Sequence, residues 1–318
     1  MNACGVVAKV KNQVSLEPFI LPALKPHEVL LESLYTAISP GTELAWLQHQ
    51  PSTPGIYPWY PGYSGCGRVL EKGSEVHSFT VGQLVACNMP HSSHVVVSES
   101  KCHPLAGEID VLEASAFRLA SIALQGVRKA QIQLGESVAV LGLGPIGLLA
   151  AQLARAAGAT FVEGIDLLEW RRKLAQACQL DSVTASASQK DFEVVIEATG
   201  VPSVIATALQ VAKQRGRLIL LGSPRGLSDG INFYDVHRKG ISILGAHELN
   251  RAQDDSLLSK TDFQDEETAL KLLVSKRLNL KPLISDVVKP QEAAEAYARL
   301  AARAEELMLI VFDWQKKP

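Results

Sequence analysis

Residues 137–157 read SVAVLGLGPIGLLAAQLARAA, and this stretch decides the fold of the half of the chain around it. The apolar segment Ser137–Leu141 predicts a buried strand, the turn GLGPIG follows at 142–147, and a helix is predicted to continue to about Ala157. A G-x-G-x-x-G turn between a strand and a helix is typical of the first unit of a dinucleotide-binding fold. The flanking elements matter, because the glycine pattern alone is weak evidence.

The glycines of this turn have separate physical roles in a nucleotide fold. The first allows the tight turn, the second lets the backbone approach a pyrophosphate, and the third allows the helix to pack closely on the strand. The helix N-terminus adds unpaired N–H groups and a partial positive charge, which favour phosphate. The predicted phosphate-binding residues are therefore Gly142, Gly144, Pro145, Ile146 and Gly147.

A carboxylate follows the next apolar strand at the place where a ribose would lie. Asp166 comes nineteen residues after Gly147 (166 minus 147). It could accept hydrogen bonds from both adenosine ribose hydroxyls and would repel a 2′-phosphate, so NAD(H) is predicted to be preferred. The alternative is that Asp166 caps the helix that follows it. Arg171 and Arg172 lie close enough in sequence to leave NADP(H) open as well.

The two halves of the chain differ in their hydrophobic pattern. Up to about Leu105, short alternating segments between glycines and prolines predict a small antiparallel barrel or sandwich. After Val111, uniformly apolar strands alternate with helical segments, which predicts a parallel sheet covered on both faces. The predicted strands of this half are Ser137–Leu141, Thr160–Ile165, Phe192–Ile196, Arg217–Leu221 and Ile241–Leu244, and a last strand is predicted at Leu307–Phe312.

The composition excludes several classes of protein. Of 318 residues, 47% are hydrophobic and 20% are charged, and the formal net charge is −2. Ordinary buried cores are expected. A nucleic acid or an anionic membrane surface would require a basic face, and crossing a bilayer would require a long apolar span, so neither a nucleic acid nor a membrane is an expected partner. The five cysteines show no C-x-x-C pairing and are expected to be free thiols. A cytoplasmic protein is predicted.

Motifs along the whole chain carry a family resemblance. VVIEATG at 194–200 and GISILGAHE at 240–248 follow the glycine turn, and GTEL at 41–44 and PGYSGCGRV at 61–69 precede it. Together they resemble the medium-chain dehydrogenase/reductase superfamily, which contains zinc alcohol dehydrogenases and quinone oxidoreductases. The resemblance implies an α/β chain in which a Rossmann doubly wound parallel sheet is inserted in a GroES-like antiparallel β-barrel domain.

The same resemblance implies domain limits, an assembly and further cofactor contacts. The catalytic domain would cover residues 1–117 and the Rossmann domain residues 118–246, and the chain would return to the catalytic domain at 247–318. A homodimer would form through the edge strand Ile241–Leu244. Close packing of strand ends is the alternative reason for small residues at the implied nicotinamide contacts, which are Thr199, Gly200, Gly222, Ser223, Gly245 and Ala246.

The chain departs from the zinc members of the superfamily at each implied ligand. Ser39 stands where they have a cysteine, and Tyr63-Ser64 where they have His-Glu. The third ligand would fall at Phe117 or Arg118. Catalytic zinc needs three protein ligands of N, S or O type, and Ser and Tyr hydroxyls are poor ligands at neutral pH. We therefore expect neither catalytic nor structural zinc.

Without zinc, another group must donate to the substrate oxygen. Tyr63 is a candidate acid, with a packed barrel aromatic as the alternative, and Thr42 matches the hydroxyl that begins the family's proton relay. A predicted substrate cleft would be lined by Tyr57, Trp59, Tyr60 and His247. His91 and His94 resemble a metal pair but lack a third ligand, so a metal site there is disfavoured.

Three functions remain open at this level. The first is a zinc-independent, NAD(H)-dependent oxidoreductase that interconverts an alcohol and a ketone on a small or medium metabolite, including aromatic or planar ones. The second is an NADPH-dependent reductase of activated C=C bonds, which Asp166 disfavours. The third is a non-catalytic dinucleotide-binding protein. A small-molecule substrate is the expected partner in the first two.

Overall fold

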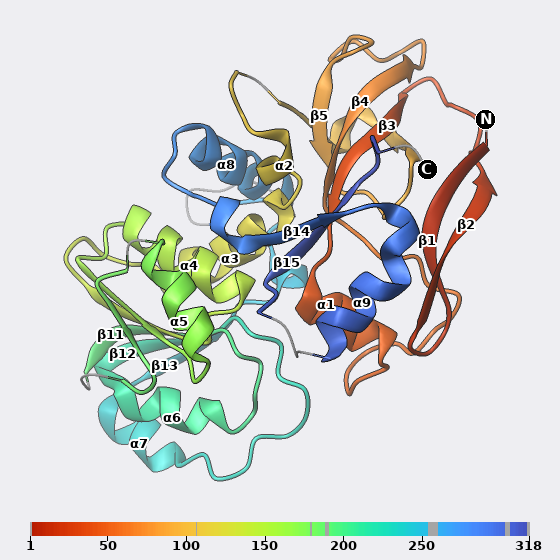
Figure 1. The fold of residues 1–318 in the computed structure, drawn as a ribbon. Coiled ribbons are helices and arrows are strands. Elements are labelled where there is room, and N and C mark those ends of the chain that lie inside the picture. Colours follow the sequence, from red (N-terminus) through yellow and green to blue (C-terminus); the bar gives the residue numbers. More distant parts are fainter. Residues whose placement is uncertain are drawn as a thin grey trace. The chain divides into compact units, whose positions relative to one another are not determined.

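The computed structural model describes residues 2–105, 107–178, 180–187, 191–253, 260–302 and 306–316. The chain divides into two compact units (Figure 1). The first unit comprises Met1–Arg118 and Leu283–Pro318, and the second unit comprises Leu119–Pro282. The second unit is therefore inserted in the first, as the sequence predicts.

The second unit is built on a six-stranded parallel sheet, which confirms the predicted α/β fold. Its strands, in spatial order, are β10 (Ser182–Thr184), β9 (Phe161–Ile165), β8 (Ser137–Leu141), β11 (Phe192–Glu197), β12 (Ala212–Leu220) and β13 (Ser242–Gly245). The order reverses between β8 and β11, where ligands bind in open sheets of this kind. Each predicted strand is present, although β12 begins five residues before Arg217, and the short, half-buried β10 was not predicted.

Helices cover this sheet on both faces. In Figure 1, α4 and α5 lie on one side of the sheet and α6 and α7 lie on the other. The helices that belong to the unit or begin at its boundary are α3 (Phe117–Ala130), α4 (Pro145–Ala156), α5 (Glu169–Gln176), α6 (Val204–Val211), α7 (Phe233–Lys239) and α8 (Asp262–Val274), with a 3-10 turn at η2 (Glu248–Asn250).

Ion pairs explain why the second unit continues past residue 246, where the sequence predicted a return to the first domain. The Arg128 side chain on α3 contacts the buried Asp265 on α8, with 2.5 Å between Nε and Oδ1. The largely buried Arg251 donates to the carbonyl oxygen of Ser121 at 2.6 Å and pairs with Asp262. These charges need one another once they are removed from water, so α8 stays with α3 and the chain leaves the unit only at Leu283.

The first unit combines a hairpin with a larger, mainly antiparallel sheet in the order β14-β15-β3-β4-β5-β7, with β6 paired to β3. The last strand pairs antiparallel with β3, so the C-terminal segment does return to this unit. The elements are β1 (Asn2–Val10), β2 (Gln13–Ile20), β3 (Glu28–Ala37), α1 (Pro40–Leu47), β4 (Gly65–Lys72), β5 (Leu84–Cys87), β6 (His94–Ser98), η1 (Glu99–Lys101), β7 (Cys102–Pro104), α2 (Val111–Ala114), η3 (Lys281–Leu283), β14 (Ile284–Val288), η4 (Pro290–Glu292), α9 (Ala293–Ala302) and β15 (Leu309–Asp313).

Among the residues that the structure describes, no helix combines the length and the apolar character needed to cross a bilayer. The buried cores instead belong to the two units separately. Strands β8, β11 and β12 pack against α6 in the second unit, and β15 packs with α1 and α9 in the first. Each unit therefore has its own hydrophobic core.

A carboxylate at the start of β11 joins that strand to its neighbours. Glu193 accepts hydrogen bonds from the Ser137 backbone N–H at 2.9 Å, from the Ser137 hydroxyl, and from Lys213 Nζ at 2.5 Å. Burial alone would raise the pKa of Glu193, but the hydrogen bonds from Lys213 and Ser137 outweigh it and hold the pKa at about 2. The charged form of Glu193 therefore stabilises the central strand pair.

We predict that Glu193→Gln destabilises the protein at neutral pH and much less in acid. Because the folded pKa of about 2 lies below the ordinary value of 4.5, the contribution is present above about pH 4.5 and is lost as the pH falls toward 2. After allowance for solvent screening, the loss at pH 7 should be about 1–2 kcal/mol. Urea unfolding at pH 7 and pH 3 measures it.

Glu169→Gln is the matched control, because Glu169 is exposed on α5 and water screens its ion pair with the exposed Lys173. Its unfolding free energy should follow the wild-type pH dependence. An equal loss at pH 7 and pH 3 in Glu193→Gln would contradict the assignment of this charge.

Candidate functional site

The glycine turn after β8 shows which glycines packing requires. Gly142 has a φ of +91°, and a Cβ there would lie 2.6 Å from the Thr199 methyl. A Cβ on Gly147 would lie 1.8 Å from the Gly142 carbonyl oxygen. At Gly144, the N-cap of α4, a Cβ would meet only the Arg171 side chain at 3.9 Å. Packing thus explains the outer glycines and leaves the middle one free for backbone approach to a pyrophosphate, which the turn fits.

Two other members of the predicted phosphate-binding set begin α4. Pro145 occupies the first position of the helix, where its missing N–H costs nothing and its fixed φ favours the helix. Ile146 follows it and is half-buried. The twelve residues of α4 present their N-terminal N–H groups at the carboxyl end of β8, the edge where this fold binds phosphates.

Asp166 is held firmly at the end of β9. Its Oδ2 accepts from the Leu143 backbone N–H at 2.8 Å, and its Oδ1 accepts from the Leu168 backbone N–H at 2.8 Å. Arg171 Nη1 lies 3.4 Å from the same Oδ2 and its guanidinium lies over the Trp170 ring. Asp166 therefore both supports the start of α5 and ties it to the glycine turn, and Arg171 stands beside both features.

A buried glutamate, which the sequence analysis missed, orders the loop after β11. Glu197 is fully buried, and its Oε1 accepts from the backbone N–H groups of Thr199 at 2.6 Å and Gly200 at 3.2 Å, and from the Thr199 hydroxyl. Burial raises the pKa of Glu197. The available signal was an acidic residue directly after the apolar run Val194–Ile196.

The small residues at the strand ends have different surroundings. A Cβ on Gly222 would lie 2.3 Å from the Gly200 nitrogen, so close packing accounts for this glycine. Ser223 and Gly245 are exposed. Ala246 is buried and donates its N–H to the Leu220 carbonyl at 3.0 Å. These residues lie at the carboxyl ends of β12 and β13, the edge on which the glycine turn also stands.

His247 and the aromatic loop have structural roles where a substrate cleft was predicted. The exposed His247 accepts the Leu249 N–H at 3.2 Å and caps η2. Tyr57 donates to the Leu47 carbonyl oxygen at 3.0 Å at the end of α1, and Trp59 packs on the same core with its ring centroid 5.5 Å from that of Trp46. Tyr60 is largely exposed. Tyr57 and Trp59 are half-buried and pack on this core, and their place in a substrate cleft stays a prediction.

Two hydroxyls stand together at the implied zinc position of the first unit. The Tyr63 hydroxyl donates to Ser39 Oγ at 2.5 Å. Phe117 and Arg118, at the implied third ligand, are both buried, and neither an aromatic ring nor a guanidinium ligates zinc. Within the described residues, no group of three or more His, Cys, Asp and Glu side chains is placed to hold a metal ion. This donor set does not fit zinc.

The buried carboxylate of Glu43 supports this hydroxyl pair. Its Oε1 accepts the Ser39 backbone N–H at 2.7 Å, and its Oε2 lies 3.1 Å from His91 Nε2 and accepts the Tyr297 hydroxyl. His91 Nδ1 lies 2.8 Å from the Thr36 hydroxyl, so both ring nitrogens are engaged. His94 instead contacts Ser93. The two histidines therefore have separate structural partners.

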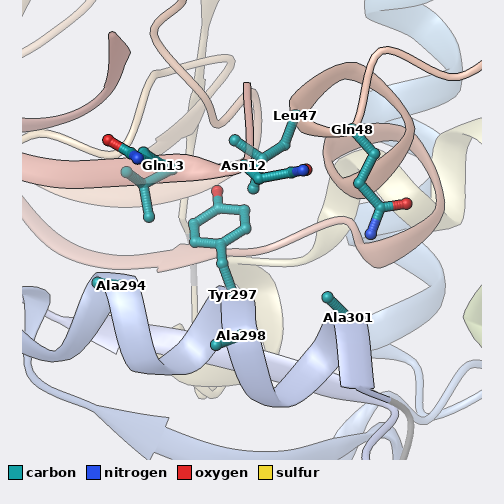
Figure 2. Close-up of a pocket in the computed structure, with 9 residues that line it drawn as sticks. Asn12, Gln13, Leu47, Gln48, Ala294, Tyr297, Ala298 and Ala301 are labelled. Atoms are coloured by element: carbon teal, nitrogen blue, oxygen red, sulfur yellow. The ribbon is translucent and has the colours of Figure 1, made fainter. Parts of the chain in front are cut away.

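Tyr297 joins this network from a distant part of the chain. Burial, together with the neighbouring Glu43 carboxylate, raises the pKa of Tyr297 well above its usual value, so it is a hydrogen-bond donor at every physiological pH. Figure 2 shows its ring rising from α9 into a pocket of about 680 Å³ beside Asn12 and Gln13. That pocket contains none of the residues that the sequence singled out as a site. Thr42, the other predicted catalytic residue, is half-buried in the first turn of α1.

Known proteins with similar sequences and folds define the class of this chain. A family model described as zinc-binding dehydrogenase matches residues 145–262. D-Xylulose reductase A of Aspergillus niger is 24% identical over 92% of this chain and 91% of its own. D-Guloside 3-dehydrogenase of Shigella flexneri is 27% identical over 73% of this chain and 70% of its own. A Sinorhizobium meliloti structure, described as a zinc-binding dehydrogenase and bound to NADP, superposes with a TM-score of 0.84 at 22% identity, covering 98% of this chain and 99% of that one.

The fold, the glycine turn and these relatives define an NAD(P)-dependent oxidoreductase. More narrowly, the family model and the relatives support the medium-chain dehydrogenase/reductase superfamily. The sequence resemblance is thereby confirmed, together with the α/β architecture that it implied.

We predict that alanine at Gly144 affects cofactor binding, whereas alanine at Gly147 affects stability. Gly144→Ala should leave the free energy of unfolding near the wild-type value, because its Cβ meets little, but should weaken NADH binding about tenfold or more by crowding the pyrophosphate. Gly147→Ala should destabilise the protein by about 1–3 kcal/mol through overpacking. Urea unfolding and calorimetric titration with NADH measure the two effects.

Gly41→Ala is the control, since a Cβ there meets no atom within 4 Å and Gly41 lies in α1 of the first unit. This variant should not lower the free energy of unfolding, and it should leave the NADH dissociation constant unchanged. Unchanged NADH affinity in Gly144→Ala would remove this turn from the cofactor site.

Proposed function

We propose that this chain is a zinc-independent oxidoreductase that interconverts a secondary alcohol and a ketone with NAD(H) as the preferred cofactor. The hydrogen bond between Tyr63 and Ser39 carries the proposal. It fills the position of two implied zinc ligands with an acidic hydroxyl and its partner. A tyrosine hydroxyl can donate a proton to a developing alkoxide, which is the task that remains when zinc is absent.

The matched family model is described as zinc-binding, and this description is compatible with a zinc-independent reaction in this chain. The match covers residues 145–262, whereas the implied ligands would stand at Ser39, Tyr63 and Phe117 or Arg118. Those positions hold hydroxyls, an aromatic ring and a guanidinium, so the chemistry of the donor set supports a reaction without zinc.

The residues of the first unit suit a proton-transfer role. A bound nicotinamide cofactor would supply the hydride chemistry that interconverts the alcohol and the ketone. In reduction, the Tyr63 hydroxyl would turn its proton from Ser39 Oγ to the substrate oxygen, and the Ser39 hydroxyl would then donate to the Tyr63 oxygen. Ser39 is itself fixed through its N–H to Glu43. Thr42, one turn into α1, would take part in proton exchange with solvent.

The residues of the second unit suit cofactor binding. Gly142, Gly144, Pro145, Ile146 and Gly147 would bind the pyrophosphate, Asp166 the adenosine ribose, and the loops that carry Thr199, Gly200, Gly222, Ser223, Gly245 and Ala246 the nicotinamide half. The fixed Asp166 carboxylate supports a preference for NAD(H), since it would repel a 2′-phosphate. The relatives named for D-xylulose and D-guloside favour a polyol or sugar-like alcohol as the substrate class.

We predict that Tyr63→Phe lowers kcat by about 10²- to 10⁴-fold, the usual contribution of a general acid. The NADH dissociation constant should stay within about twofold of the wild-type value, because Tyr63 lies in the first unit. Turnover of a polyol panel with NAD+, and of the matching ketoses with NADH, measures kcat. Elemental analysis of the same preparations should find far less than one zinc per chain.

Tyr234→Phe is the matched control, because Tyr234 is a largely exposed tyrosine on α7, and it should retain wild-type turnover. About one zinc per chain, or full activity of Tyr63→Phe, would overturn the assignment of Tyr63 as the acid.

For the cofactor, we predict tighter binding of NADH than of NADPH at one fixed salt concentration. Arg171→Gln should widen this preference by about tenfold, because Arg171 lies beside Asp166 and Gly144 and would be available to pair with a 2′-phosphate there. Calorimetry with both cofactors measures the ratio. Tighter binding of NADPH would contradict the role of Asp166 and would favour the alternative reaction, reduction of an activated C=C bond.

A further inference from the structure

The loop after β12 carries a half-buried arginine, Arg225, whose surroundings differ from those of the other half-buried arginines. Arg225 follows Gly222 and Ser223 by two to three residues and is half-buried. Burial lowers the pKa of its guanidinium, and no carboxylate contributes in the opposite direction. Among the residues described, the Arg225 side chain has no hydrogen-bond or ion-pair partner.

The contrast with other half-buried arginines makes this observation informative. Each of the others in the described chain contacts a carboxylate or a carbonyl oxygen; they are Arg128, Arg171, Arg172, Arg217, Arg251 and Arg299. A guanidinium that loses part of its water without gaining an anion raises the free energy of the protein. A charge in this condition is characteristic of binding sites.

The backbone that carries Arg225 is fixed in place. The Arg225 N–H donates to the Gly200 carbonyl at 3.4 Å, and the Ser228 hydroxyl donates to the Pro202 carbonyl at 2.8 Å. The loop after β12 is thus tied at two points to the loop after β11, which Glu197 orders in turn. Hydrogen bonds to the neighbouring loop therefore hold the loop that carries Arg225.

The strand order separates Arg225 from the adenosine half of the proposed cofactor site. Asp166 follows β9 and the glycine turn follows β8, whereas Arg225 follows β12, three strands from β9 in the order β9-β8-β11-β12. At about 4.8 Å per strand, this is about 14 Å across the sheet. The cation therefore stands on the nicotinamide side of the switch point, where a substrate is oxidised or reduced.

We propose that Arg225 binds a carboxylate or phosphate group of the substrate, so that the enzyme acts on an anionic alcohol or ketone. This inference rests on the proposed function, because it places the substrate beside the nicotinamide half of the cofactor. A planar guanidinium with five N–H donors recognises either oxyanion through paired hydrogen bonds.

Inorganic phosphate is the probe for this site, in a buffer without other oxyanions and at constant ionic strength. NADH is first titrated into the full-length protein, and phosphate is then titrated into the protein–NADH complex. The wild type should bind phosphate saturably. Arg225→Gln should weaken this binding about tenfold or more while the NADH dissociation constant stays within about twofold. Arg238→Gln, at an exposed arginine on α7, should match the wild type.

A substrate pair gives a second readout. D-Sorbitol and D-sorbitol 6-phosphate differ only in the anionic group, and D-gluconate supplies a carboxylate. Wherever turnover is measurable, kcat/KM should favour the anionic member about tenfold or more, and Arg225→Gln should remove this preference while changing the neutral substrate little. Arg225→Lys should restore part of it.

The outcomes separate this inference from the proposed function. Absence of NADH binding would remove the proposed function itself. With NADH bound normally, failure of phosphate to bind, or equal binding by wild type and Arg225→Gln, would overturn the anion site alone. Competition between phosphate and NADH, with weaker NADH binding in Arg225→Gln, would show that Arg225 serves a cofactor phosphate and would also overturn the proposal.

Discussion

The carboxylate of Glu43 is the interaction on which the proposed reaction centre depends. It is fully buried, and a buried carboxylate is tolerated only when its oxygens are satisfied by donors. The donors come from Ser39 at the start of α1, His91 before β6, and Tyr297 on α9. Satisfying one charge therefore fixes three separate segments, and Ser39, so fixed, accepts the hydrogen bond of Tyr63.

The second unit follows a related logic with a different buried acid. Glu197 gathers the N–H groups at the end of β11 and thereby sets the loop on which the loop after β12 rests. In both units a buried carboxylate organises the backbone next to the residues proposed to act. The hydrogen bonds to Glu43 and to Glu197 Oε1 restrict the backbone around them, and this is useful where reacting groups must be held within fractions of an ångström.

The departures from the zinc members of the superfamily form a consistent set. A serine, a tyrosine and a phenylalanine–arginine pair occupy the implied ligand positions, and two of these side chains bond directly to each other. Loss of a single ligand would leave unpaired neighbours, whereas this site is rebuilt around hydroxyl hydrogen bonds. An enzyme without a metal would need other charges to orient its substrate, and Arg225 is a positive charge held by a fixed backbone.

The sequence by itself determined the elements whose signals are local. The strand–turn–helix at 137–157, the remaining strands of the parallel sheet and Asp166 at the end of β9 could be read from hydrophobic runs and glycine spacing, because these reflect neighbouring residues. Tertiary structure decided what depends on residues far apart in the chain. Glu43 and Tyr297 are 254 residues apart, Tyr57 and Trp59 pack on a core, and the second unit ends at Pro282 because Arg128 and Arg251 meet α8. Burial and pairing of charges arise only when distant segments meet, so no local pattern encodes them.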